Sequence, residues 1–248
     1  MTNTISESII NVETINGEMS VLLKEPNDDH KHPTIVIFHD APGIRKSVHD
    51  FMLRLAGEGY RVVAPDLHHR HGRMIGYEPD EIDDAARAKI SEMLNSMTDE
   101  QIQQDLDDTL IAVGVAADEK LGTIGFCLGA RAVFRTFMRL PAQFVVGAAW
   151  HPSLLVDDAD DSPHLTAARL VQPLYFGVGK DDDVQSVEMH QPFFDAVAPL
   201  SNVEVEIFDG AGHGFTWPSG PTYHDVAAKG SWSKTMALFA EHLDTPAH

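Results

Sequence analysis

The sequence predicts an α/β fold in which helices cover both faces of a mainly parallel sheet. Short apolar runs of strand length alternate along the chain with longer amphipathic stretches, the order that βαβ units produce. The first such run, Thr-Ile-Val-Ile-Phe at residues 34–38, has the β-branched character of a strand buried on both faces. Before it, residues 8–12 and 19–23 flank Asn16-Gly17, which predicts an antiparallel hairpin at the start of the chain.

The remaining elements follow from the same alternation. Thr98-Asp99-Glu100-Gln101 is a capping-box pattern, in which Thr98 and Gln101 each bond the backbone of the other, so a helix is expected to begin there. The other expected strands are residues 61–65, 123–126, 144–148, 174–178 and 203–208, and the expected helices are residues 48–57, 99–116, 128–140 and 236–243.

The stretch from residue 68 to residue 97 is the least regular part of the chain. It follows the strand expected to end at Pro65, and segments after strand carboxyl ends line the ligand crevice of open α/β sheets. We therefore expect it to cap a site. The 248 residues contain no internal repeat and no low-complexity linker, so residues 1–248 are expected to form one domain.

Composition restricts the partners of the protein. Lysine and arginine number 18 against 38 acidic residues, and a net charge of −20 repels nucleic acid and anionic membrane surfaces. The single cysteine cannot form an internal disulfide, and the first residues lack the basic start and apolar run of a signal peptide. We expect a cytoplasmic protein, monomeric or homodimeric, that acts on a small molecule rather than on nucleic acid or a membrane.

Residues 125–129, Gly-Phe-Cys-Leu-Gly, have the pattern of a nucleophile elbow with cysteine in place of the usual serine. The chain reverses so sharply between a strand and a helix that the flanking positions, Gly125 and Gly129, have no room for side chains. The turn directs the amide of Leu128 toward the site, where it would stabilise an oxyanion. A buried structural cysteine in a glycine-flanked turn is the alternative, but the strand before and the helix after favour Cys127 as the nucleophile.

A thiol nucleophile needs a base, and the base needs an acid to orient it. In folds with this elbow the acid follows the next-to-last strand and the histidine follows the last one. The expected strand at residues 203–208 is followed by His213 among glycines, and the strand at residues 174–178 is followed by Asp181-Asp182-Asp183. His213 is the predicted base, and one of these three aspartates is the predicted acid.

Three segments together resemble the dienelactone hydrolases (carboxymethylenebutenolidases), which have the α/β-hydrolase fold. They are the elbow, residues 212–215 (Gly-His-Gly-Phe) and residues 38–43 (Phe-His-Asp-Ala-Pro-Gly), and the resemblance extends from about residue 33 to residue 243. It implies a Cys127, His213 and Asp182 triad when the acid is counted from Pro173 at the start of its strand. Counting back from Val184 would choose Asp181 instead.

The same resemblance implies further site residues. Asp40 occupies the position of a family carboxylate that contacts the resting thiol, although an aspartate that bonds its own turn is the alternative reading. The amide of Ala41 would be the second oxyanion donor. The family enzyme holds its substrate's carboxylate with arginines, for which Arg70 or Arg131 would be the candidates here. Trp217 follows the histidine where the family has an arginine, and this indicates a more apolar pocket.

The leading prediction is a cysteine hydrolase that cleaves a small ester or lactone through an acyl-enzyme and needs no metal or organic cofactor. A broad carboxylesterase or a thioesterase on the same triad is the first alternative. His68, His69 and His71, with Asp66, offer a second alternative, a transition-metal site. A non-catalytic binding module built on a hydrolase fold is the third.

Overall fold

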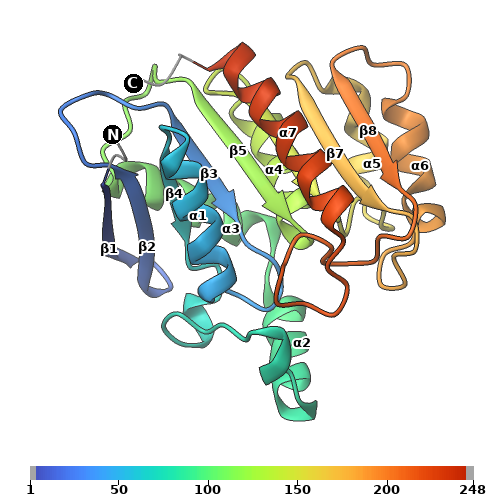
Figure 1. Ribbon diagram of the computed structural model, residues 1–248, viewed down its shortest axis with the longest axis horizontal. Helices are drawn as coiled ribbons and strands as arrows, with labels where there is room; N and C mark the ends of the chain where they lie inside the picture. Colours follow the sequence, from blue (N-terminus) through green and yellow to red (C-terminus); the bar gives the residue numbers. More distant parts are fainter. Residues whose placement is uncertain (1–3, 244–248) are drawn as a thin grey trace.

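One mixed sheet of eight strands runs through residues 4–243, which the computed structural model describes (Figure 1). The order across the sheet is β1-β2-β4-β3-β5-β6-β7-β8. β2 pairs antiparallel with both β1 and β4, and all other neighbours pair parallel. The strands are β1 (Ile5–Thr14), β2 (Gly17–Pro26), β3 (Thr34–Phe38), β4 (Arg61–Pro65), β5 (Leu121–Phe126), β6 (Phe144–Trp150), β7 (Leu174–Gly179) and β8 (Val203–Phe208).

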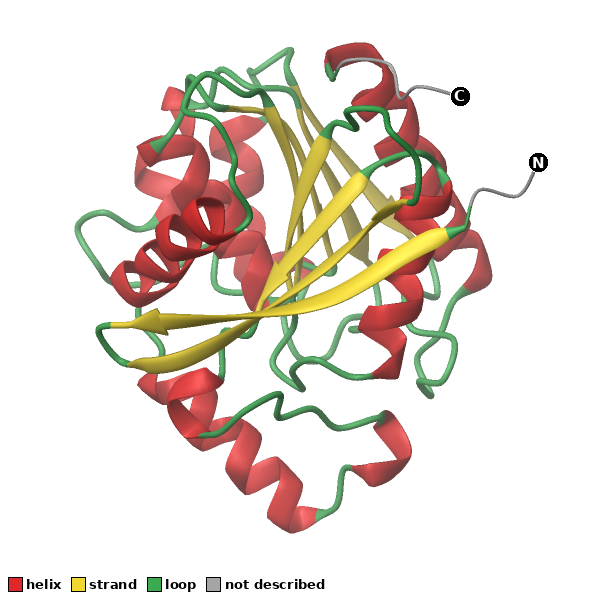
Figure 2. Ribbon diagram, turned by 90° about the vertical axis from the view of Figure 1, so that its left-hand side faces the viewer, coloured by secondary structure: helices red, strands yellow, loops and turns green. Residues whose placement is uncertain are grey.

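The predicted hairpin is confirmed. Thr14 and Gly17 form the closing pair of the β1–β2 ladder, and Gly17 has a φ of 109°, which glycine adopts without the strain of a side chain. The ladder extends to the pair Ile5 and Pro26, so both strands are longer than their apolar centres predicted. Figure 2 shows this hairpin crossing the edge of the twisted sheet.

Two helical layers cover the sheet, which confirms the predicted α/β-hydrolase architecture. α1 (Lys46–Gly57) and α7 (Asp225–His242) lie on one face, in front of the sheet in Figure 1. α3 (Asp99–Ala112), α4 (Leu128–Arg139) and α6 (Val187–Val197) bury their apolar residues against the opposite face. The two faces therefore have separate apolar cores, because the β-branched strands between them present side chains to both sides.

Among the helices longer than α5 (Pro163–Thr166), which was not predicted, three differ most from the expectation. α6 was not predicted because Pro192 lies inside it and the sequence signal for a helix is broken there. α7 begins at Asp225 rather than at residue 236, since its first turns bury the small residues Ala227, Ala228 and Ser231 instead of a large apolar stripe. α2 (Asp84–Ser96) was also missed.

The segment that was expected to be irregular contains two short helical turns, η1 (His69–His71) and η2 (Pro79–Glu81), followed by α2. α2 buries only Ala86 and Met93, which explains its weak apolar pattern. In Figure 1 it projects beyond the carboxyl ends of the parallel strands. A last short helix, α5 (Pro163–Thr166), lies between β6 and β7. Among residues 4–243, no helix has both the length and the apolar character that crossing a bilayer requires.

Candidate active site

The turn between β5 and α4 holds Cys127 in a strained backbone conformation, with φ of 53° and ψ of −116°. A Cβ on Gly125 would lie 2.1 Å from the carbonyl oxygen of Gly129, and one on Gly129 would lie 2.2 Å from the carbonyl oxygen of Phe38. Backbone atoms cannot move aside, so both positions require glycine. The sharp turn predicted from the sequence is therefore present.

A cavity of about 530 Å³ lies at the carboxyl ends of the parallel strands, and Cys127 is on its wall, 9% exposed. The other wall residues come from the loops after β3, β6, β7 and β8 and from the neighbourhood of α2, which confirms that this segment covers the site. The predicted site residues that share the cavity with Cys127 are Asp40, Ala41, Leu128, His213 and Trp217.

The histidine and one of the aspartates meet beside the cavity. Nδ1 of His213 donates to Oδ2 of Asp182 over 2.7 Å. The other carboxylate oxygen of Asp182 accepts from the amides of Val184, at 3.0 Å, and Gln185, at 2.7 Å, and the residue is 4% exposed. Asp181 is exposed on the surface instead. Of the two aspartates left open by the sequence, the structure brings Asp182 to His213.

The electrostatics of the site favour a charged Cys127–His213 pair. Burial alone would raise the pKa of the Cys127 thiol, but the charge and hydrogen bond of His213, aided by the hydroxyl of Ser153, lower it overall. Burial alone would lower the pKa of His213, but the charge of the Cys127 sulfur and the bond to Asp182 raise it to about 10. Both shifts favour a thiolate beside an imidazolium.

Leu128 and Ala41, whose amides were predicted to be oxyanion donors, both lie at the cavity. Leu128 is the first residue of α4, where the helix leaves backbone N–H groups without intrahelical acceptors, and Ala41 lies in the turn after β3. Among the backbone hydrogen bonds of turns, loops and helix caps in residues 4–243, none is donated by either amide. Both residues line the cavity beside the Cys127 sulfur.

Asp40 is held by other partners than the thiol. Arg45 donates to both carboxylate oxygens, at 2.5 and 2.9 Å, and Nε1 of Trp217 donates to Oδ2 at 2.8 Å. Burial raises the pKa of Asp40, but the Arg45 guanidinium more than offsets this and keeps the pKa below its usual value. Within residues 4–243 no hydrogen bond joins Asp40 to Cys127, whereas the hydroxyl of Ser153 lies 3.2 Å from the sulfur.

Arg70 does not reach the cavity, contrary to its assignment as a substrate-binding candidate. Its two terminal nitrogens each lie 2.7 Å from a carboxylate oxygen of Asp105 in α3, and this bidentate pair anchors the loop after β4. The arginines on the cavity wall are Arg45, which is paired with Asp40, and Arg87 on α2. The Arg87 side chain is 68% exposed.

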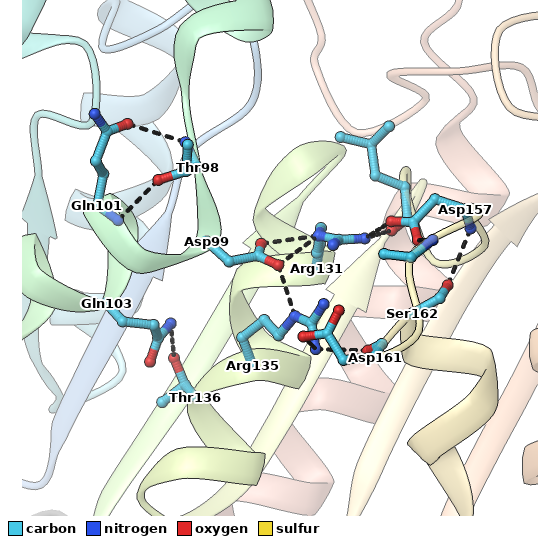
Figure 3. Close-up of polar contacts among 12 residues, drawn as sticks. Thr98, Asp99, Gln101, Gln103, Arg131, Arg135, Thr136, Asp157, Asp161 and Ser162 are labelled. Atoms are coloured by element: carbon cyan, nitrogen blue, oxygen red, sulfur yellow. Dashed lines mark hydrogen bonds and ion pairs between the residues drawn. The ribbon is translucent and has the colours of Figure 1, made fainter.

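Arg131 is likewise committed to structural ion pairs. Its guanidinium contacts Asp99 at 2.8 and 3.0 Å and Asp157 at 2.5 Å, and Arg135 joins the same network through Asp99 (Figure 3). Figure 3 also shows the predicted capping box, in which Thr98 and Gln101 bond each other's backbone. These contacts connect α3, α4 and the loop after β6 and leave Arg131 outside the catalytic cavity.

The proposed transition-metal site is wrong. Nε2 of His68 donates to the carbonyl of Ala41 at 2.9 Å, and the ring of His71 contacts Ser96 at 2.6 Å. His69 contacts Asp105, and Asp66 accepts from backbone amides. Across the described part of the chain, no three His, Cys, Asp or Glu side chains are grouped so that they could hold a metal ion. The side chains diverge because each one satisfies a different local partner.

Two residues of the site were missed by the sequence analysis. His151 and Ser153 follow β6 directly, and both line the cavity. The signal that could have found them is their position after a buried parallel strand, because the carboxyl ends of such strands meet at one edge of the sheet.

Comparison with known proteins identifies the family. Residues 19–243 match the model of the dienelactone hydrolase family. The chain is 27% identical over 227 residues to a carboxymethylenebutenolidase of Rhodococcus opacus, covering 89% of this chain and 86% of that one. It is 27% identical over 248 residues to a Salmonella typhi protein provisionally named carboxymethylenebutenolidase, covering 96% and 88% of the two chains.

Solved structures show the same likeness. A Klebsiella pneumoniae protein whose crystal structure is provisionally titled a dienelactone hydrolase superposes with a TM-score of 0.82 at 25% identity, covering 96% of this chain and all of that one. The family match spans most of the chain, and it confirms the resemblance found in the sequence. The protein is therefore a member of the dienelactone hydrolase family and a hydrolase of that type.

Proposed function

We propose that this protein hydrolyses a small ester or lactone through a Cys127 thioester intermediate, with His213 as base and acid and Asp182 as its orienting carboxylate. The observation that carries the proposal is the 2.7 Å bond from His213 to Asp182 beside a strained Cys127 in one cavity. Strain of this kind persists where a site depends on it, and the bonded pair supplies the base that a thiol nucleophile needs.

Acylation begins with attack of the Cys127 thiolate on the substrate carbonyl. The carbonyl oxygen takes up negative charge and accepts from the amides of Leu128 and Ala41, two residues that line the cavity. When the tetrahedral intermediate collapses, the carbon–oxygen bond breaks, and the imidazolium of His213 gives its proton to the departing alkoxide. A thioester on Cys127 and a neutral His213 remain.

Deacylation uses the same groups in the opposite direction. Neutral His213 removes a proton from water, and the resulting hydroxide attacks the thioester carbonyl. The Asp182 carboxylate stabilises the imidazolium that forms and fixes Nδ1 as the protonated nitrogen. Collapse expels the Cys127 thiolate, releases the carboxylic acid and restores the starting pair.

The cavity wall favours an apolar substrate. Its side chains include Ile82, Ile90, Leu94, Leu154 and Val184. Arg45 is neutralised by Asp40, and the Arg87 guanidinium extends toward solvent. A substrate with a free carboxylate would lose hydration without a buried cation to replace it. This supports a broad carboxylesterase over a strict dienelactone hydrolase.

Initial rates on an aryl acetate, a neutral lactone, a carboxylate-bearing lactone and an acyl thioester would rank the candidate substrate classes.

Replacing Cys127 with alanine tests the cysteine mechanism. Loss of the nucleophile is expected to reduce kcat/KM on an aryl ester by at least about 10³-fold. The melting temperature should stay close to that of the wild type, since only one sulfur at the cavity wall is removed. Because Cys127 is the only cysteine, alkylation of the wild type with iodoacetamide is a matched control that should abolish the same activity. Undiminished turnover in Cys127→Ala would contradict the mechanism.

A further inference from the structure

We propose that Ser153 is a catalytic residue whose hydroxyl donates a hydrogen bond to the Cys127 thiolate, so that the nucleophile is ionised before substrate binds. The inference rests on the proposed function, because it concerns the same sulfur. Oγ of Ser153 lies 3.2 Å from Sγ of Cys127, and the two residues are 4% and 9% exposed. This is within the range of a hydrogen bond to sulfur, and water has little access to it.

The backbone holds Ser153 against the elbow independently of its side chain. The amide of Ser153 donates to the carbonyl of Cys127 at 2.9 Å, and the amide of Cys127 donates to the carbonyl of Trp150 at 3.2 Å. The amide of His151 bonds Gly177 in β7 at 2.8 Å. The end of β6 therefore runs alongside the nucleophile, and these bonds keep the backbone of Ser153 beside Cys127, within reach of its sulfur.

Backbone strain marks the same segment. His151 has a φ of 39° and Leu154 a φ of 61°, so residues with positive φ stand close on both sides of Ser153. Within residues 4–243, the non-glycine residues with positive φ are Met74, Cys127, His151 and Leu154. Three of these four lie where β6 meets the elbow, and strain concentrated in this way is a feature of functional sites.

The direction of the hydrogen bond follows from where the proton of the thiol goes. Asp40 is occupied by Arg45 and Trp217, so it is not free to take that proton or to contact the sulfur. His213 faces the sulfur and holds the proton with the help of Asp182. A thiolate has no hydrogen to give, and therefore Ser153 must donate.

The titratable groups around the sulfur come from four loops. His213, after β8, and Arg45, after β3, favour the thiolate, whereas Asp40 opposes it. Asp182, after β7, acts through His213. His151, after β6, stacks edge-on to His213 with ring centroids 5.1 Å apart, and burial lowers its pKa to about 3, so it is neutral at physiological pH. Ser153 is thus the uncharged donor in an otherwise ionic arrangement.

The test is the rate of alkylation of Cys127 by iodoacetamide between pH 4 and pH 10, measured without substrate in the wild type and in Ser153→Ala. Only the thiolate reacts, so the inflection reports its formation. Loss of a hydrogen bond to a charged group is expected to move the inflection up by about one pH unit. The kcat/KM for an aryl ester should fall about tenfold at pH values below the wild-type inflection and little above the shifted inflection, whereas a purely structural loss would reduce it in both ranges.

Matched variants separate the hydroxyl from the volume of the side chain. Ser153→Thr keeps the hydroxyl and should retain the wild-type inflection. Ser153→Val introduces a side chain nearly isosteric with threonine but without the hydroxyl, so its inflection should move up as that of Ser153→Ala does. A melting curve will show whether Ser153→Ala folds. If it does not, the comparison of Ser153→Thr with Ser153→Val still tests whether the hydroxyl stabilises the thiolate. Ser162→Ala removes the hydroxyl of another buried serine, outside the cavity, and should leave the profile unchanged.

The outcomes distinguish the two proposals. Superimposable profiles for the wild type and Ser153→Ala, or for Ser153→Thr and Ser153→Val, would overturn the role of Ser153. A shifted profile in a protein that hydrolyses none of the esters would support the hydroxyl–thiolate bond and refute the proposed function. Hydrolysis that depends on Cys127 but not on Ser153 would support the proposed function and refute the role of Ser153.

Discussion

Among the single residues of the site, Asp182 shows most clearly how one contact separates neighbours of the same type. Asp182 is buried and bonded to His213, whereas Asp181, one position earlier, is exposed. A surface aspartate is fully hydrated and contributes little to the orientation of a remote ring. The buried carboxylate both fixes the tautomer of His213 and favours its protonated form.

Replacement of these neighbours gives a direct comparison. Asp182→Asn keeps an oxygen for the amides of Val184 and Gln185 but removes the negative charge beside His213, so kcat/KM should fall by about 10³- to 10⁴-fold. Asp181→Asn should stay within about twofold of the wild type, as expected for a surface change. Steady-state kinetics on one aryl ester would measure both. Equal losses in the two variants would show that the bond to His213 is not the source of the effect.

At the scale of elements, the site depends on how closely the elbow approaches β3. Gly129 is the second residue of α4 and lies against the end of β3, so that helix and strand meet without an intervening side chain. This approach lets α4 direct its amino end, with its unpaired N–H groups, at the cavity.

Gly129→Ala is therefore expected to be severe. The added Cβ would lie 2.2 Å from the Phe38 carbonyl oxygen, so the elbow or β3 must shift, and both activity and the urea midpoint should drop markedly. Gly57→Ala is the matched control, because no atom lies within 4 Å of its Cβ position at the end of α1. That substitution should leave activity unchanged and be neutral or slightly stabilising. Similar melting temperatures for the two variants would contradict the packing argument.

At the scale of the whole molecule, burial of uncharged histidines makes the fold sensitive to acid. Burial lowers the pKa of His68 and His151 to about 3 and that of His190 to about 4. The unfolded chain binds protons at these residues below pH 6.5, whereas the folded chain does so only near pH 3 to 4. The free energy of unfolding should therefore decrease as the pH falls through this window, by up to about 1.4 kcal/mol per pH unit for each histidine.

His190 offers the cleanest test, since it is 1% exposed and neither ring nitrogen has a hydrogen-bond partner in the described residues. His190→Phe should reduce the stability lost between pH 7 and pH 5 by up to about 2 kcal/mol, as measured by urea unfolding at the two pH values. The exposed His30→Gln should leave that loss unchanged. An unaltered pH dependence in His190→Phe would show that this histidine does not contribute to it.

Much of the fold could be predicted from the sequence because the inner strands are apolar and buried on both faces, and the edge strand β8 has an alternating Val-Glu-Val-Glu pattern. Residues 34–38, 61–65 and 203–208 were predicted with the bounds that the structure has. α2 was not predicted because its role is to cover a cavity rather than to fill a core, so it lacks a strong apolar stripe. Likewise, the ion pairs that remove Arg70 and Arg131 from the cavity join segments far apart in the sequence.

The sequence by itself determined the fold class, the position of Cys127 at a glycine-flanked turn and the family, because each depends on short-range pattern. Tertiary structure decided which aspartate meets His213, that Arg45 and Trp217 hold Asp40, and that Ser153 contacts the sulfur. These contacts form between the loops that follow β3, β5, β6, β7 and β8. The parallel sheet brings the carboxyl ends of its strands to one edge, and only there do residues distant in the chain come within hydrogen-bonding range.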